Sequence, residues 1–169
     1  MKPLEINIEK IARLAEQRED ENYRFRVFLK GQEDDKIDIM VHKMDKEIRS
    51  QIDCKECGNC CIHLHPSVTD EEIETLSRLD HHTPIEYVAK NIVNDNSENM
   101  KYLKDTPCKY LHDKKCSIYL ERPEDCKSYP HTQNDHFIHR TFVMIDNYGV
   151  CPIVFNLFEQ LKKELNFKR

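Results

Sequence analysis

The chain has 169 residues, of which 34% are charged and 38% are hydrophobic, and its formal net charge is -5. This length suffices for one ordinary domain with its own core, and the composition is that of a folded rather than a disordered protein. The acidic balance argues against a general nucleic-acid binder, and no apolar run approaches the ~18 residues that a membrane span needs.

Residues 1–53 contain no cysteine and are predicted to form an N-terminal helical region. Apolar residues recur at helical spacing within residues 8–28 and again, more regularly, within residues 37–52. The polar stretch at 17–22 predicts an exposed or interrupted first helix. A break at Gly31, followed by three acidic residues, predicts a helical hairpin whose apolar stripe we interpret as core.

Two capping boxes predict the starts of the next helices. Thr69 is followed three residues later by Glu72, and Thr83 is followed in the same way by Glu86. Pro84 stands at the first helical position of the second helix, where its missing N–H group costs nothing. Apolar residues at helical spacing follow each box, so both helices are expected to be amphipathic.

The rest of the chain shows less regular sequence patterns. Residues 94–99 are a polar linker, and residues 101–151 carry short, irregular patterns between cysteines. Residues 137–145 are rich in β-formers and make a candidate strand. Cys151 and Pro152 open a last predicted helix with an apolar face and a basic C-terminal end.

Eight cysteines are the unusual feature of the composition. The N-terminus lacks the apolar segment of a secretory signal, so we expect a cytoplasmic chain that does not enter a membrane. Cytosolic thiols are kept reduced, and such a cysteine count then indicates metal binding or redox chemistry rather than disulfides.

Four of these cysteines lie in one run, Cys54-Lys-Glu-Cys57-Gly-Asn-Cys60-Cys61. The CxxC-Gly pattern is typical of a metal knuckle, because the glycine accepts a backbone conformation that a Cβ would resist. Cys60 and Cys61 are adjacent, and we expect their side chains to diverge. That favours either two metal centres close together or a structural role for one of the pair.

The other four cysteines are spread out, and all eight are predicted metal ligands: Cys54, Cys57, Cys60, Cys61, Cys108, Cys116, Cys126 and Cys151. Four plus four fits two tetrahedral Cys₄ sites, or one Cys₄ cluster with spare thiols. Such sites select zinc, iron–sulfur clusters or Cu(I). Several basic residues lie beside cysteines, and Arg122 is the one that we expect to have a fixed role.

No catalytic residue can be assigned from the sequence. It contains no Gly-rich phosphate loop, Ser-His-Asp pattern or HExxH motif. The βαβ context of a CxxC thiol–disulfide exchanger is also missing. Four histidines lie near the cysteines, but the thiols already suffice as ligands, so surface or hydrogen-bonding roles are favoured for them: His63, His65, His112 and His131.

The cysteine pattern resembles that of a known family. The run from Cys54 to Cys61, followed by Pro107-Cys108 and then by Cys116-Ser-Ile-Tyr-x₂-Arg-Pro-x₂-Cys126, is similar to the YkgJ-type cysteine-cluster family over about residues 54–152. The resemblance implies a zinc- or iron-chelating domain that uses these cysteines, and it implies no particular reaction. The family is related to flagellin lysine N-methylases, but nothing in this chain marks a site for a methyl donor.

We therefore predict a mostly α, irregular, metal-stabilised single domain with little β structure, an N-terminal helical hairpin and a C-terminal helix. Its regions are the helical residues 1–53 and a cysteine-cluster metal-binding domain at 54–169. The expected cofactor is zinc or iron, including an iron–sulfur cluster, and its role is mainly structural or in binding an unidentified protein partner. The alternatives are a redox or modifying enzyme with an iron–sulfur or iron centre, and metal storage or delivery.

Overall fold

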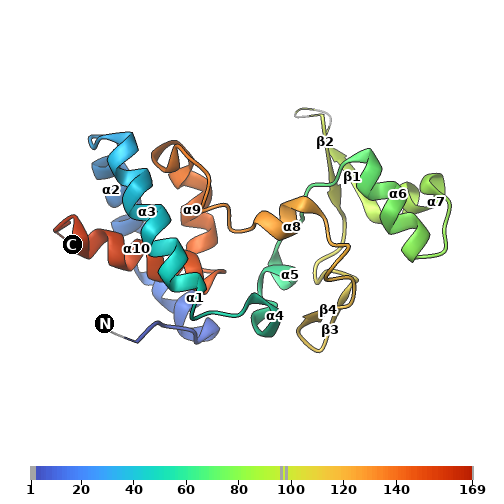
Figure 1. The fold of residues 1–169 in the computed structure, drawn as a ribbon, viewed down its shortest axis with the longest axis horizontal. Coiled ribbons are helices and arrows are strands. Elements are labelled where there is room, and N and C mark those ends of the chain that lie inside the picture. The colour runs from blue at the N-terminus through green and yellow to red at the C-terminus, as the bar shows by residue number, and fades with distance from the viewer. Residues whose placement is uncertain (1–2, 96, 98, 169) are drawn as a thin grey trace. The chain divides into compact units, whose positions relative to one another are not determined.

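The computed structural model describes residues 3–95, 97 and 99–168, and it confirms a mostly α fold with little β structure (Figure 1). Contacts along the chain divide it into two compact units. Unit 1 combines Met1–Asp53 with Pro130–Arg169, and unit 2 is the continuous stretch Cys54–Tyr129. The helices in the described part of the chain all lack the length and apolarity that crossing a membrane requires.

The two units divide the chain differently from the two predicted regions. Both divisions have a boundary after residue 53, but residues 130–169, which the sequence prediction assigns to the cysteine-cluster domain, lie in unit 1. The reason is a packing preference: the C-terminal helix buries its apolar face against the third helix of the N-terminal region.

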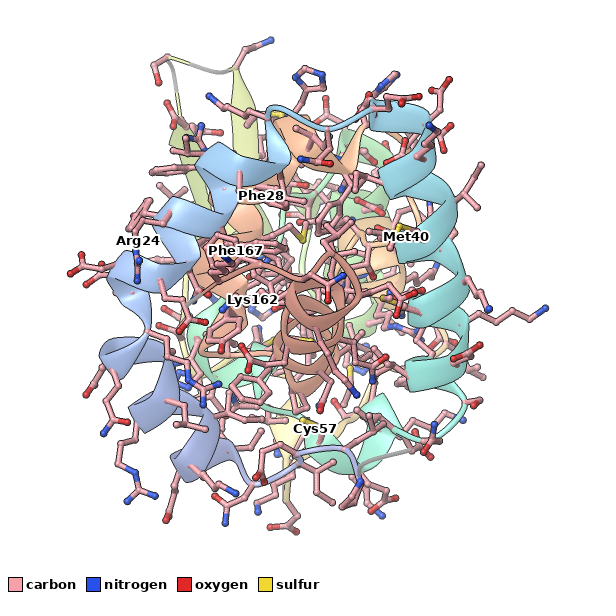
Figure 2. The ribbon with its side chains drawn as sticks, turned by 90° about the vertical axis from the view of Figure 1, so that its left-hand side faces the viewer. Arg24, Phe28, Met40, Cys57, Lys162 and Phe167 are labelled. Atoms are coloured by element: carbon pink, nitrogen blue, oxygen red, sulfur yellow. The ribbon has the colours of Figure 1, made fainter. Side chains whose placement is uncertain are left out.

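Unit 1 is built from α1 (Ile8–Gln17), α2 (Glu19–Leu29), α3 (Asp34–Arg49), η1 (Phe137–Arg140), α9 (Thr141–Tyr148) and α10 (Pro152–Glu164). The predicted interruption of the first helix is confirmed, because α1 ends and α2 begins on either side of Arg18. The predicted hairpin is also present, but α10 lies between its arms (Figure 2). Phe25 of α2 packs edge-on against Phe158 of α10 at 5.9 Å between ring centroids, and α3 packs along α10 as well.

The candidate strand at residues 137–145 is wrong, since these residues form η1 and the start of α9. Three of their apolar β-forming side chains are buried in unit 1, Phe137, Ile138 and Ile145, whereas Phe142 and Val143 are exposed. Preference for a strand depends on context, and here packing against α2 and α3 overrides it.

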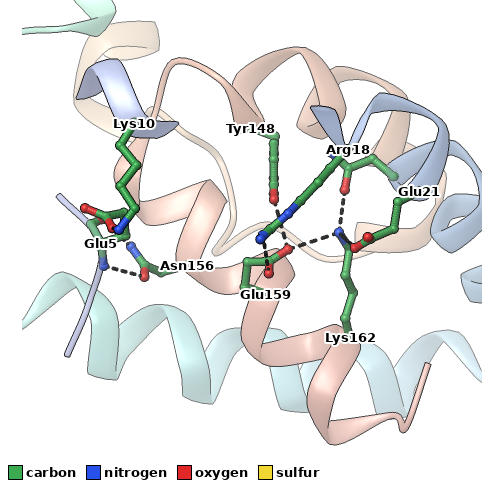
Figure 3. A network of polar contacts seen from close by, with 9 residues as sticks. Glu5, Lys10, Arg18, Glu21, Tyr148, Asn156, Glu159 and Lys162 are labelled. Carbon is green, nitrogen blue, oxygen red and sulfur yellow. Dashed lines mark hydrogen bonds and ion pairs between the residues drawn. The ribbon is translucent and has the colours of Figure 1, made fainter. Parts of the chain in front are cut away.

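Unit 1 also buries a network of charged side chains, drawn in Figure 3. The side chain of Lys162 is 2% exposed and lies 2.7 Å from Glu21 and 3.1 Å from Glu159. Arg18 pairs with Glu159 at 2.6 Å, and the Tyr148 hydroxyl donates to the same carboxylate at 2.9 Å. The charges in this network therefore compensate one another inside the unit.

Unit 2 is built from α4 (Cys54–Cys57), α5 (Cys60–His63), α6 (Asp70–Leu79), α7 (Pro84–Asn91), β1 (Ile92–Asp95), β2 (Met100–Leu103), β3 (Leu111–His112), β4 (Lys115–Cys116) and α8 (Glu124–Ser128). Both predicted capping boxes are confirmed, at the starts of α6 and α7. The predicted polar linker at 94–99 covers the end of β1 and the connection to β2, and its residues 96 and 98 lie outside the described residues. β1 pairs with β2 and β3 pairs with β4, both antiparallel.

A small apolar core holds unit 2 together, and two cysteines lie against it. Its buried members are Val68, Ile73, Leu76, Tyr87, Ile92, Leu103, Tyr110 and Ile118. Cys108 and Cys116 are partly buried on its surface. Folding of this core therefore positions two of the predicted ligands.

Candidate metal centre

The first cysteine run lies on two single-turn helices joined by a tight bend. α4 carries the first two cysteines of the run and α5 the second two. Gly58, between them, has a φ of 60°, and a Cβ there would overlap the backbone carbonyl of Lys114. The predicted role of the glycine is confirmed, for a positive φ and a close backbone approach together exclude a side chain.

The backbone that Gly58 approaches is the turn of the β3–β4 hairpin. Its two turn residues, Asp113 and Lys114, have positive φ values of 47° and 65°, as a type I′ turn requires. α4 packs against β4, and Glu56 pairs with Lys115 at 3.2 Å. The CxxC bend is thereby held beside the strand that carries Cys116.

Cys61 connects the first run to the later cysteines. Its carbonyl oxygen accepts the Cys108 N–H at 2.7 Å. The Cys60 thiol donates a hydrogen bond to the Cys61 sulfur and lowers the pKa of Cys61 to about 7, although burial opposes this shift. The expectation that these two side chains diverge is wrong, because rotation about the Cα–Cβ bonds suffices to bring two adjacent sulfurs within hydrogen-bonding reach.

Three later thiols share the electrostatic environment of Cys61. Burial raises the pKa of Cys108, of Cys116 and of Cys126, the last to about 12, and negative charge on Cys61 raises each of them further. We call Cys61, Cys108, Cys116 and Cys126 the central thiol group. Their mutual repulsion as thiolates is what a bound cation would relieve, so this donor set fits a thiolate-ligated zinc or iron ion.

Arg122 has the fixed position that its sequence context predicted. Its guanidinium lies 3.6 Å from the centroid of the Tyr119 ring and donates a hydrogen bond to the Tyr119 carbonyl oxygen. Its positive charge lowers the pKa of both Cys61 and Cys116, against the effect of burial in each case. Arg122 therefore favours the ionised form of two members of the central thiol group.

The remaining predicted ligands differ in their surroundings. Cys54 is exposed and Cys57 partly exposed. Cys151 belongs to unit 1, where it is 6% exposed and stands immediately before α10. Seven of the eight cysteines thus lie in unit 2 and one in unit 1.

The sulfur atoms of the central thiol group are further apart than the ligands of one bound metal ion. Among the described residues, no three cysteine sulfurs lie within 4.8 Å of one another. A tetrahedral zinc ion with Zn–S bonds of about 2.3 Å needs sulfurs about 3.8 Å apart. Metal binding would therefore draw these side chains together.

His65, one of the four histidines near the cysteines, contacts the Leu103 carbonyl oxygen through Nδ1 at 3.0 Å, which is the hydrogen-bonding role that the sequence predicts.

Comparison with known proteins identifies the family of the cysteine pattern. The family model described as "CxxCxxCC: Putative zinc- or iron-chelating domain" matches residues 53–146. No curated protein and no solved structure matches the chain. The matched span includes all seven cysteines of unit 2 and ends before Cys151. The chain belongs to the CxxCxxCC family of zinc- or iron-chelating domains.

Proposed function

We propose that unit 2 is a metal-binding module in which the central thiol group holds one zinc or iron ion. The observation that carries the proposal is the convergence of four thiols from four separate segments: Cys108 donates its N–H to the Cys61 carbonyl oxygen, Cys108 and Cys116 lie against one core, and the charge of Cys61 acts on the other three thiols. α5, the connection before β3, β4 and α8 each contribute one of them. Ligands from several segments are what a metal needs in order to fix a fold.

The metal's main role in this proposal is structural. Four thiolates fill the coordination shell of a tetrahedral ion and leave no open position for a substrate. The apolar core of unit 2 is small, so it leaves much of the stability to be supplied by the metal. Structural zinc in small domains contributes apparent binding energies on the order of 10 kcal/mol. The ion would hold the shape of unit 2, and with it any surface that meets a protein partner.

The second candidate function is a redox or modifying enzyme with an iron–sulfur or iron centre. It draws on the cysteines outside the central thiol group, of which Cys54 is exposed and Cys57 and Cys60 partly exposed. Spare, accessible thiols beside a metal are more useful for redox chemistry than for holding a fold.

Metal content after single cysteine substitutions tests the leading proposal. We expect wild-type protein, purified without oxygen, to contain about one zinc or iron ion for its one four-thiolate site. Cys126→Ser should lose most of that metal, because Cys126 is a buried member of the central thiol group. Elemental analysis of both proteins, with circular dichroism as a check on folding, gives the result.

The matched control is Cys151→Ser, which removes a buried cysteine from unit 1. It should keep the wild-type metal content. Loss of metal from Cys151→Ser together with retention by Cys126→Ser would overturn the assignment. The visible spectrum separates the two functions: a colourless zinc protein supports the structural role, whereas iron with acid-labile sulfide and a broad band near ~400 nm supports the enzyme.

A further inference from the structure

Unit 1 contains a second set of metal-ligating side chains, chemically unlike the thiols of unit 2. Asp34 and Asp38 stand one turn apart at the start of α3, so both project from the same face of the helix. His136 precedes η1, which packs against α3. One oxygen from each carboxylate and one ring nitrogen of His136 lie within 4.8 Å of one another.

The donor–donor distances lie on either side of the spacing that a single ion requires. His136 Nδ1 lies 2.7 Å from Asp34 Oδ2, and His139 Nε2 lies 3.9 Å from the same oxygen. Two donors that each sit 2.0–2.2 Å from a first-row metal ion are about 3 to 3.5 Å apart. The proton now shared between His136 and Asp34 therefore occupies a place that a metal ion could take with only small movements of these side chains.

Asp38 links the start of η1 to α3 through its carboxylate. It is 8% exposed, and its carboxylate oxygens accept the backbone N–H groups of His136 at 2.6 Å and of Phe137 at 2.9 Å. These bonds lock the start of η1 onto α3. The histidine is consequently presented to the two carboxylates by buried contacts rather than by a free loop.

One carboxylate oxygen of the group lacks a hydrogen-bond partner among the described residues. This atom is Asp34 Oδ1, which is buried. A buried carboxylate oxygen without a partner costs free energy, and a cation that both oxygens of Asp34 coordinate would supply the missing interaction.

We infer that Asp34, Asp38 and His136 form a second metal site, with His139 as a fourth donor. Carboxylate and imidazole ligands suit divalent first-row ions such as Mn²⁺, Fe²⁺, Co²⁺ and Zn²⁺, whereas thiolates such as those of unit 2 prefer softer metal ions. The inference stands on unit 1 alone and does not depend on the proposed function of unit 2.

Titration with Co²⁺ tests the site in the full chain as purified. We expect about one Co²⁺ per chain to bind, with weak visible d–d bands and without the strong near-ultraviolet charge-transfer band that thiolate ligands produce. Asp34→Asn and His136→Gln should each weaken Co²⁺ binding at least ~10-fold, as loss of one ligand from a small set does.

The matched control is Asp35→Asn, which neutralises an exposed carboxylate in the same turn of α3. It should bind Co²⁺ as wild type does. The side chain of His136 is 72% exposed, so His136→Gln should leave folding intact and decides the matter if Asp34→Asn does not fold. Absence of Co²⁺ binding, equal binding by the His136→Gln and Asp35→Asn variants, or a thiolate charge-transfer band as the only signal would overturn the site.

Discussion

At the scale of single residues, Gly58 most directly determines how the first cysteine run is presented. A Cβ at this position would overlap the Lys114 carbonyl, and its φ of 60° is unfavourable for any side chain. We expect Gly58→Ala to destabilise unit 2 by about 2 kcal/mol or more, since the left-handed conformation alone costs roughly 1–2 kcal/mol. Metal affinity should fall with it, and chelator competition together with thermal melting measures both effects.

Gly31 offers a matched control for that substitution. A Cβ there would lie 3.5 Å from the Phe28 carbonyl oxygen, an ordinary contact. Gly31→Ala should change stability by no more than about 0.5 kcal/mol and leave metal affinity unaltered. Equal effects of the two substitutions would mean that the close approach at Gly58 does not matter.

The thiols of the central group also differ from one another in a way that bears on metal capture. The Cys60 hydrogen bond lowers the pKa of Cys61 to about 7, whereas burial raises that of Cys126 to about 12. Because metal binds the ionised thiol, the lowered pKa of Cys61 favours metal binding and the raised pKa of Cys126 opposes it. The buried thiols would then lose their protons as the ion binds.

At the scale of elements, the helices with complete local signals are the ones that the sequence predicts best. α6 and α7 begin at capping boxes in which each threonine side chain and each glutamate satisfies a backbone N–H group. α4, α5 and η1 are four residues long, and α5 and η1 have no side-chain hydrogen bond at their N-caps. Their conformations depend on distant partners, such as the Lys114 backbone beside Gly58 and the Asp38 carboxylate at the start of η1.

The charged network on α10 yields a prediction at this scale. Lys162 is 2% exposed and lies between the carboxylates of Glu21 and Glu159, which are themselves largely buried. Lys162→Met keeps most of the apolar stem but removes the ammonium group that lies between the two carboxylates, of which Glu159 keeps its pairing with Arg18. We expect a loss of about 3–5 kcal/mol in the free energy of unfolding, as is typical when one partner of a buried ion pair is removed.

Lys163, the next residue along α10, is exposed and provides the comparison. Lys163→Met should change the free energy of unfolding by no more than about 0.5 kcal/mol. Urea denaturation followed by circular dichroism measures both variants. A Lys162→Met protein as stable as Lys163→Met would show that the network contributes little net stability.

At the scale of the whole molecule, the division into two units predicts an uneven response to metal removal. Unit 1 has its own core of buried apolar side chains from six helical elements, whereas unit 2 combines a small core with the central thiol group. A strong chelator should lower the melting temperature of unit 2 by more than about 10 °C, since each 1 kcal/mol shifts a domain of this size by roughly 4–8 °C. The helices of unit 1 should persist.

Differential scanning calorimetry with and without chelator, after elemental analysis has established metal loss, makes this measurement. One transition should move to lower temperature and another stay in place. An unchanged melting profile in metal-free protein would rule out a structural metal.

Much of the fold follows from the sequence alone because it rests on local spacing. The mostly α class, the break at Arg18, the two capping boxes and the C-terminal helix that opens at Pro152 depend on residues within a few positions of one another. The family follows from sequence in the same way, since the spacing of its cysteines is a local pattern.

What only the tertiary structure decided depends on contacts between distant segments. Local spacing predicts neither that residues 130–169 join the N-terminal helices nor that Cys151 lies in unit 1. Nor does it reveal that Asp38 meets His136, 98 positions further on, although carboxylates one turn apart and two nearby histidines were visible signals. These long-range contacts are determined by how the buried apolar faces of whole helices fit together. No short stretch of sequence encodes that fit.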